Sequence, residues 1–280
     1  MDKIINYKPT TPGRRHASVL NSHELTKPRL KRLLVGKRGH AGRNNQGKIT
    51  VRHQGSGVKQ KLRLVDFKQD KWEVPGVVSA IEYDPGRTAN LGLIKYADGD
   101  WRYVIVPEDV KVGQQIVTSQ KKLIMEIGNR FPLWLIPAGT LVCNVELYPG
   151  SGGKLARSAG NALTLMLVEG DHAQVKMPSG EIRKISKNCL ATIGQTSNQA
   201  WRTVRFGKAG RKIKMGIRPS VRGKVMNPVD HPHGGGEGKN PVGLKQPKNV
   251  YGKKALGVKT RSTKKLSDKL IVQRRKRKTA

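Results

Sequence analysis

Charge is distributed along this chain in three blocks, and that distribution limits what the chain can fold into. Residues 1–63 contain 16 Lys and Arg against 2 acidic residues, residues 64–200 contain 15 against 14, and residues 201–280 contain 24 against 3. The nearly neutral middle can bury a core, whereas the two arms repel themselves unless a polyanion neutralises them. Solubility needs a net charge of only about 2–8 in magnitude. The total of +36 therefore predicts a nucleic-acid partner.

The middle block shows two sets of short strand patterns, with a break near residues 121–131. The first set covers residues 77–83, 91–96, 101–106 and 115–117, and Asp98-Gly99 between two of them is a hairpin signal. The second set covers residues 139–147, 162–168, 173–177, 180–185 and 189–193. Each set is enough for one small closed barrel. The sequence thus predicts a mainly β fold of two tandem small β-barrels, with basic extensions at both ends and only short helices.

This division predicts four segments: a basic N-terminal extension at 1–40, a first barrel at 41–122, a second barrel at 123–200 and a basic C-terminal extension at 201–280. The two cysteines, Cys143 and Cys189, lie in apolar runs without a CxxC partner, so we expect neither a zinc site nor a disulfide framework. The N-terminus lacks the order of a signal peptide, and no apolar run reaches a transmembrane length. We expect a soluble cytoplasmic protein.

The run Val225–Lys239 contains three consecutive glycines, two prolines and two histidines, so it forms neither a helix nor a central strand. Such a run packs only if something outside the protein orders it. A metal site or an acid–base set could be formed by the side chains of Asp230, His231, His233 and Glu237. However, His-Pro-His is expected to point its two rings in different directions. We therefore expect imidazoles and glycine backbone that pack against RNA.

The segment Gly42–Lys48 matches the Gly-x4-Gly-Lys part of a phosphate-binding loop, but Ile49 stands where a Ser or Thr should hold magnesium. The residues that follow are strand-like, so the helix N-terminus that binds anions is missing. We expect a flexible basic loop that contacts RNA phosphates.

Three further segments predict how RNA is contacted. The glycine-rich run Gly150–Gly160 carries Lys154 and Arg157 and lets the backbone approach a phosphate ridge. Arg52 and His53 place a cation and a stackable ring beside glycines, which suits irregular or single-stranded RNA. The C-terminal tail is typical of phosphate binding. Neither a helix-turn-helix nor a zinc finger is recognisable, which argues against a DNA-binding protein.

Several segments, in order along nearly the whole chain, closely resemble the bacterial-type large-subunit ribosomal protein L2 family. They are Lys8–His16, Gly42–Asn45, Arg52–His53, Val65–Phe67, Glu82–Pro85, Leu155–Gly160, Gly207–Gly210 and Met226–Gly238. The resemblance implies an oligonucleotide-binding (OB) barrel followed by an SH3-like barrel. It also implies primary binding to large-subunit rRNA, a bridge to small-subunit rRNA, neighbouring ribosomal proteins as partners, and support for tRNA binding near the peptidyl-transferase centre. The family's histidine at the position of His231 has been proposed, with dispute, to act in peptide-bond formation.

Two positions depart from the family pattern. Val58 stands where the family has a histidine, and the segment Lys248–Gly252 replaces the family's Thr-Pro-Trp-Gly, so that Tyr251 can stack but the rigid Pro-Trp element is gone. Both departures concern local contacts.

The expected function is that of a structural rRNA-binding component of the large subunit in translation, in a bacterial cytoplasmic ribosome, with an organellar ribosome as the alternative. A free-standing RNA chaperone and an enzyme are the other classes; the former would bind unrelated RNAs equally well. We expect no catalytic residue, no metal site and no cofactor, apart from structural Mg²⁺ that the rRNA could carry. The predicted rRNA-binding residues are Arg14, Arg15, His16, Arg43, Asn44, Arg52, His53, Lys154, Arg157, Arg222, Asn227, His231, His233, Lys239, Arg261, Arg274 and Arg275.

Overall fold

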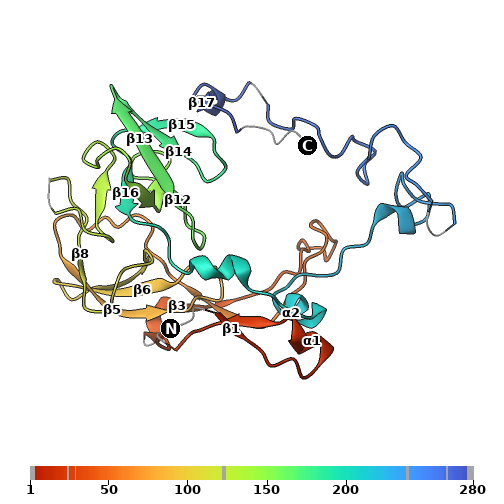
Figure 1. Cartoon of the computed structure of the whole chain (residues 1–280), viewed down its shortest axis with the longest axis horizontal. Helices are drawn as coiled ribbons and strands as arrows, with labels where there is room; N and C mark the ends of the chain where they lie inside the picture. The colour runs from red at the N-terminus through yellow and green to blue at the C-terminus, as the bar shows by residue number, and fades with distance from the viewer. Residues whose placement is uncertain are drawn as a thin grey trace. The chain divides into compact units, whose positions relative to one another are not determined.

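The computed structural model describes residues 4–275 except 24, 29, 122, 123, 238, 239 and 263, and shows a mainly β protein (Figure 1). Its contacts divide the chain into two units. Unit 1 consists of residues 1–38, 59–211 and 266–280, and unit 2 consists of residues 39–58 and 212–265. No helix in the described part of the chain is long and apolar enough to cross a membrane.

The first barrel is built on a four-stranded antiparallel sheet in the order β7-β6-β5-β8. The strands are β5 (Gly76–Glu82), β6 (Leu91–Tyr96), β7 (Trp101–Ile105) and β8 (Gln115–Ile116), and β3 (Leu34–Lys37) pairs separately with β4 (Gln60–Arg63). The predicted Asp98-Gly99 hairpin is confirmed: Lys95 pairs with Trp101, and Gly99 has a φ of 84° that favours glycine. The strand patterns of the first set were thus read correctly.

The sheet of the first barrel curls because one segment reaches both of its edges. Val65 bridges Tyr103 on β7, and Trp72 bridges Thr118 just beyond β8. Both faces of the sheet are buried, since Leu91 and Leu93 belong to one hydrophobic cluster while Ile94 belongs to another. This arrangement leaves few unpaired strand edges, as expected of a small barrel.

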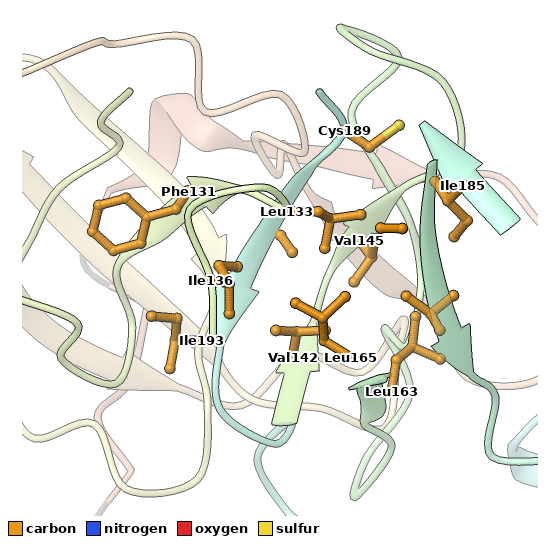
Figure 2. Packing of buried hydrophobic residues seen from close by; sticks show 13 residues of the cluster. Phe131, Leu133, Ile136, Val142, Val145, Leu163, Leu165, Ile185, Cys189 and Ile193 are labelled. Carbon is orange, nitrogen blue, oxygen red and sulfur yellow. The ribbon is translucent and has the colours of Figure 1, made fainter. Parts of the chain in front are cut away.

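The second barrel is a seven-stranded antiparallel sheet in the order β17-β15-β14-β13-β10-β16-β9. Its strands are β9 (Arg130–Pro132), β10 (Leu141–Cys143), β13 (Leu163–Glu169), β14 (His172–Lys176), β15 (Ile182–Ser186), β16 (Leu190–Ile193) and β17 (Ile271–Gln273); β11 (Val145–Glu146) pairs with β12 (Gly153–Leu155) beside it. Figure 2 shows its core, in which Phe131, Leu133 and Leu165 are fully buried.

Two details of the second barrel escaped the sequence patterns. The run 139–147 is interrupted at Asn144, whose φ of 48° separates β10 from β11. The tail strand β17 pairs with β15, with Ile182 opposite Gln273. Both cysteines are buried and free, and burial raises the pKa of the Cys143 and Cys189 thiols to about 12.

The two basic arms are not independent of each other. Strands β1 (Ile4–Asn6) and β2 (Ser18–Leu20) form a hairpin around α1 (Pro12–Arg15). The short 3-10 helix η2 (Gln199–Thr203) begins just before the C-terminal arm, and α2 (Ala209–Lys214) lies within it. Ser18 donates its N–H to the Arg205 carbonyl at 2.8 Å, and the Ser18 hydroxyl accepts the Arg205 N–H at 2.9 Å. The start of the C-terminal arm therefore pairs with the N-terminal hairpin. Within the described residues, three more 3-10 turns are η1 (Lys31–Leu33), η3 (Gly223–Val225) and η4 (Leu266–Asp268).

Candidate nucleic-acid interface

Unit 2 has the composition of a surface that needs a polyanion. It contains 17 Lys and Arg against Asp230 and Glu237, a net charge of +15. None of its described side chains is buried, and several apolar ones are largely exposed, for example Val229 at 90% and Leu256 at 83%. Without a hydrophobic core to offset conformational entropy, such a unit depends on hydrogen bonds and on what binds it.

Predicted contacts Arg52 and His53 lie where the two segments of unit 2 meet. The His53 carbonyl accepts the Arg218 N–H at 3.0 Å, and Gly55 donates its N–H to the Gly216 carbonyl at 2.8 Å. At Gly57 a Cβ would stand 2.8 Å from the Gly216 nitrogen, so only glycine fits there. Arg52 and His53 are exposed. Backbone pairing thus fixes this segment while leaving both side chains accessible.

Two loops of unit 2 share the pattern Asn-x-x-Gly-Lys and the same hydrogen bonds. In the loop 44–48, Asn44 Oδ1 accepts the N–H of the second and fourth following residues at 3.0 and 2.9 Å. In the loop 249–253, Asn249 Oδ1 accepts the equivalent pair at 3.0 and 2.9 Å. Gly47 and Gly252 have φ values of 75° and 74°. The first loop, with the exposed Arg43 at its start, was expected to be flexible but is closed by its own bonds.

One expectation about the loop that carries His231 and His233 is wrong. The rings of His231 and His233 do not point apart; they meet edge to face with centroids 4.7 Å apart. The cause is a turn rather than an extended chain, since Gly234 donates its N–H to the His231 carbonyl at 2.8 Å. His231 Nδ1 accepts the His233 N–H at 3.0 Å, and His233 Nε2 accepts the Lys248 N–H at 2.8 Å. Both rings are therefore oriented by backbone donors, and Asp230 is not needed for this.

The backbone around these histidines leaves no room for side chains at the neighbouring glycines. A Cβ at Gly223 would lie 2.4 Å from the His231 ring, and one at Gly234 would lie 2.2 Å from the Asn227 carbonyl oxygen. That carbonyl also accepts the N–H of Asp230 at 3.0 Å. Arg222 and Asn227 are exposed beside this packed turn.

In unit 1, one arginine from each basic arm lies against the ring of Tyr7. The guanidinium of Arg14 lies 5.2 Å from the centroid of Tyr7, and that of Arg211 lies 5.1 Å from the same centroid. Arg14, Arg15 and His16 are all exposed in or just after α1. The cation–π contacts hold the charges of Arg14 and Arg211 at the hairpin without neutralising them.

The glycine-rich loop between β11 and β12 is fixed by a buried carboxylate. Glu146 accepts the N–H groups of Gly150 and Gly152, each at 3.0 Å, and Arg130 Nη2 lies 3.5 Å from Glu146 Oε1. Both charged side chains are 1% exposed. Lys154 and Arg157, which follow this loop, are exposed. A buried ion pair therefore supports the segment that carries two predicted RNA contacts.

Acidic residues of the first barrel are engaged by cations. Arg102 donates to Asp66 at 2.7 Å and to Asp100 at 3.0 Å, and Lys71 lies 3.0 Å from Asp100. The hydrogen bond from Lys71, followed by that from Arg102, lowers the pKa of Asp100 to about 2. Among the described residues, no group of three or more His, Cys, Asp or Glu is arranged to hold a metal ion.

The remaining predicted contacts lie in the tail. Arg274 forms a two-pronged ion pair with Asp268, at 2.9 and 2.8 Å, while Arg275 and Arg261 are exposed. Lys239 lies outside the described residues. All the individual rRNA contacts stay predictions, and the structure adds that Arg274 has an internal acidic partner.

Two small β-barrels with exposed cationic loops, joined to a coreless unit of high positive charge, define a nucleic-acid-binding protein on a β-barrel scaffold. Residues 30–118 match the family model described as "Ribosomal Proteins L2, RNA binding N-terminal domain", and residues 126–252 match "Ribosomal Proteins L2, C-terminal domain". The chain belongs to the ribosomal protein L2 family. It is a large-subunit ribosomal protein that binds RNA, located in the ribosome with large-subunit rRNA and neighbouring ribosomal proteins as its partners.

Sequence patterns missed three features of this interface. The repeated Asn-x-x-Gly-Lys pattern was visible in the sequence and could have been found by comparing the two loops. The contact of Tyr7 with Arg211 had no local signal, because the two residues are distant in sequence. The contact of Tyr7 with Arg14 and the support of Gly150 and Gly152 by Glu146 join residues that are close in sequence, but they depend on turns that no pattern specified.

Proposed function

We propose that this protein, besides binding large-subunit rRNA, helps to join the two ribosomal subunits through a bridge to small-subunit rRNA and supports tRNA binding near the peptidyl-transferase centre. The observation that carries this proposal is unit 2, with its net charge of +15 and no buried side chain among its described residues. A coreless cationic unit gains order from phosphates, and neutralising many of them releases condensed counterions.

In this proposal the protein acts by placing RNA and not by chemistry of its own. His231 is held by the N–H of His233 on one nitrogen, so it serves as part of a packed turn. The protein would need no cofactor, although structural Mg²⁺ could accompany the rRNA phosphates. The proposed setting is the cytoplasmic ribosome of a bacterium.

Reconstitution tests the proposal. Large subunits are assembled from rRNA and the other ribosomal proteins with the full chain, without it, or with a chain lacking residues 212–265. Sedimentation with small subunits measures joining, and filter binding measures tRNA retention. We expect both to fall strongly without the chain and with the deletion, while the deletion variant still co-sediments with large subunits. Normal joining and tRNA binding with the deletion variant would contradict the proposal.

A further inference from the structure

We propose that a surface formed by two loops of unit 1 binds a cationic segment of a neighbouring ribosomal protein. The surface, which we call the Ile124 surface, consists of Asp109, Val112, Ile124, Glu126 and Ile127. Its partner is a protein and not RNA. The inference therefore goes beyond the rRNA contacts of this chain and does not depend on the proposed subunit bridge.

The two loops that form the Ile124 surface, residues 107–114 and 124–128, lie against each other. Gln114 Nε2 donates to the Ile127 carbonyl at 2.7 Å, which ties the first loop to the second. A Cβ at Gly194 would lie 2.9 Å from a side chain of each loop, so both loops meet at this glycine. Side chains from the two loops therefore share one surface although they are separated in sequence.

The second loop is held in place by hydrogen bonds and by one inward side chain. Met125 packs against the hydrophobic core of the second barrel. The Ile124 carbonyl accepts the side-chain amide of Asn129 at 3.1 Å and the N–H of Glu126 at 3.0 Å. Because the backbone is bonded and Met125 points inward, the exposure of Ile124 and Ile127 is set by the fold and is not that of a loose loop.

Three aliphatic residues of the Ile124 surface face solvent. Ile124 is 78% exposed and Val112 is 58% exposed, and Ile127 is exposed beside them. Single exposed apolar side chains are common on protein surfaces, whereas several held together on adjoining, well-ordered loops indicate an interaction site. Aliphatic side chains form no hydrogen bond with a phosphate but pack well against another protein.

The charges of the Ile124 surface argue against RNA as the partner. Residues 107–128 contain three acidic residues and three lysines, so this stretch has no net charge in a chain of +36. Asp109 and Glu126 are exposed, and within the described part of the chain neither side chain has an ion pair or a hydrogen bond. A phosphate at this surface would face two carboxylates that no cation neutralises, whereas Lys or Arg side chains of a protein would pair with them.

A segment of a neighbouring ribosomal protein has the chemistry that this surface requires. Proteins that bind rRNA neutralise its phosphates with Lys and Arg, so the neighbours of this chain on the same RNA are rich in these residues. Their long side chains join a cationic end to an apolar stem. Such a segment pairs with Asp109 and Glu126 while its apolar parts cover the aliphatic residues, which is the usual division of an interface into an apolar centre and a polar rim.

Photo-crosslinking in assembled large subunits tests which class of molecule covers the Ile124 surface. The full chain carries the photoreactive amino acid benzoylphenylalanine in place of Ile124, and purified subunits are irradiated. Mass spectrometry then identifies the crosslinked product. We expect a peptide of another large-subunit protein that contains Lys or Arg. A crosslink to rRNA, or no crosslink in fully assembled subunits, would overturn the proposal.

Charge reversal has opposite effects for the two classes of partner. Large subunits are reconstituted with a chain that carries Asp109→Lys and Glu126→Lys, and quantitative mass spectrometry measures how much of the crosslinked protein they retain after a salt wash. We expect retention to fall about tenfold, because two attractive charge pairs become repulsive. The slope of log affinity against log salt for rRNA alone should stay unchanged. A slope steeper by up to ~0.9 for each new lysine would show that the surface faces RNA and that the proposal is wrong.

Glu169→Lys is the matched control for the reversal, since Glu169 is also exposed and has no ion pair or side-chain hydrogen bond among the described residues. We expect normal retention with this variant, and an equal loss would reduce the effect to total charge and contradict the proposal. Ile124→Ser removes an exposed apolar side chain without changing charge or the core, and it should lower retention about tenfold. Normal retention with both Ile124→Ser and the double reversal would show that no partner depends on this surface.

Discussion

His231 uses one of its two ring nitrogens inside its own loop. Because Nδ1 accepts the His233 N–H at 3.0 Å, the neutral ring carries its proton on Nε2. A nitrogen that already holds a proton cannot act as a general base. The ring also fills the space beside Gly223, where a Cβ would lie 2.4 Å away. At the scale of this residue, packing and the tautomer both favour an architectural role.

His231→Ala should therefore impair subunit assembly, subunit joining or tRNA placement. Ribosomes that incorporate the variant fully should still form peptide bonds within roughly tenfold of the normal rate, below the ~10²–10⁴-fold cost of removing an acid–base group. His231→Asn is the matched variant, because its amide oxygen can accept the His233 N–H without transferring protons, and it should restore assembly. Single-turnover peptide transfer measures the rate. A thousandfold loss in fully assembled ribosomes of either variant would favour catalysis.

At the scale of elements, the loops 44–48 and 249–253 show how a short pattern sets a shape. In each loop one amide side chain closes the turn, and glycine takes the left-handed conformation that the turn needs. The closing Oδ1 atoms of Asn44 and Asn249 are engaged within the loops. The cations and the 82% exposed ring of Tyr251 are what the loops present to solvent.

Asn249→Ala should lower rRNA affinity although it removes no charge, because the tip loses the hydrogen bonds that hold Tyr251 and Lys253 in place. We expect a loss of about 0.5–1.5 kcal/mol, which is the usual net worth of a hydrogen bond. The salt slope should be unchanged, whereas Lys253→Met, which leaves the loop closed, should flatten the slope by up to ~0.9. Filter binding over a salt series measures both. Wild-type affinity for Asn249→Ala would show that RNA does not depend on this loop.

At the scale of the whole molecule, the buried hydrophobic side chains that stabilise the fold lie in unit 1 and not in unit 2. The three hydrophobic clusters consist of residues of unit 1, and the described part of unit 2 contributes no buried side chain. The hairpin of residues 4–20 is bonded to Arg205 and Arg211 within unit 1, so the N-terminal arm shares the stability of the barrels more than its charge alone suggested.

Limited proteolysis of the free protein should accordingly cut within residues 39–58 and 212–265 first and leave fragments that retain residues 4–20 and 64–211. Large-subunit rRNA should protect the early cleavage sites, because bound phosphates order what has no core. Mass spectrometry of the fragments identifies the sites. Resistance of residues 212–265 without RNA would show that unit 2 is stable by itself, and an RNA of unrelated sequence serves as the control.

Part of the fold and of the site followed from sequence because the responsible signals are local. Alternating apolar residues and the Asp98-Gly99 turn specify the strands around Leu91–Tyr96, since side chains alternate along any strand. The break at Asn144 and the pairing of β17 with β15 did not follow, because each depends on residues far away in the chain. The ring contact of His231 with His233 was missed for another reason: an extended chain was expected where Gly234 closes a local turn on the His231 carbonyl.

The sequence by itself determined that this protein has a β-rich middle and a polyanionic partner, because periodicity and summed charge are properties of composition and order that survive any folding detail. Only the tertiary structure decided which cations are balanced by acids and which remain for a ligand. Arg87 and Arg183 have acidic partners two or three residues away, which the sequence shows. Arg102 and Arg130 instead pair with the distant Asp66 and Glu146, and Arg157 lies against the ring of Phe67. The reason is physical: an ion pair or a stacked ring depends on distance in space, which the chain fixes only when it folds.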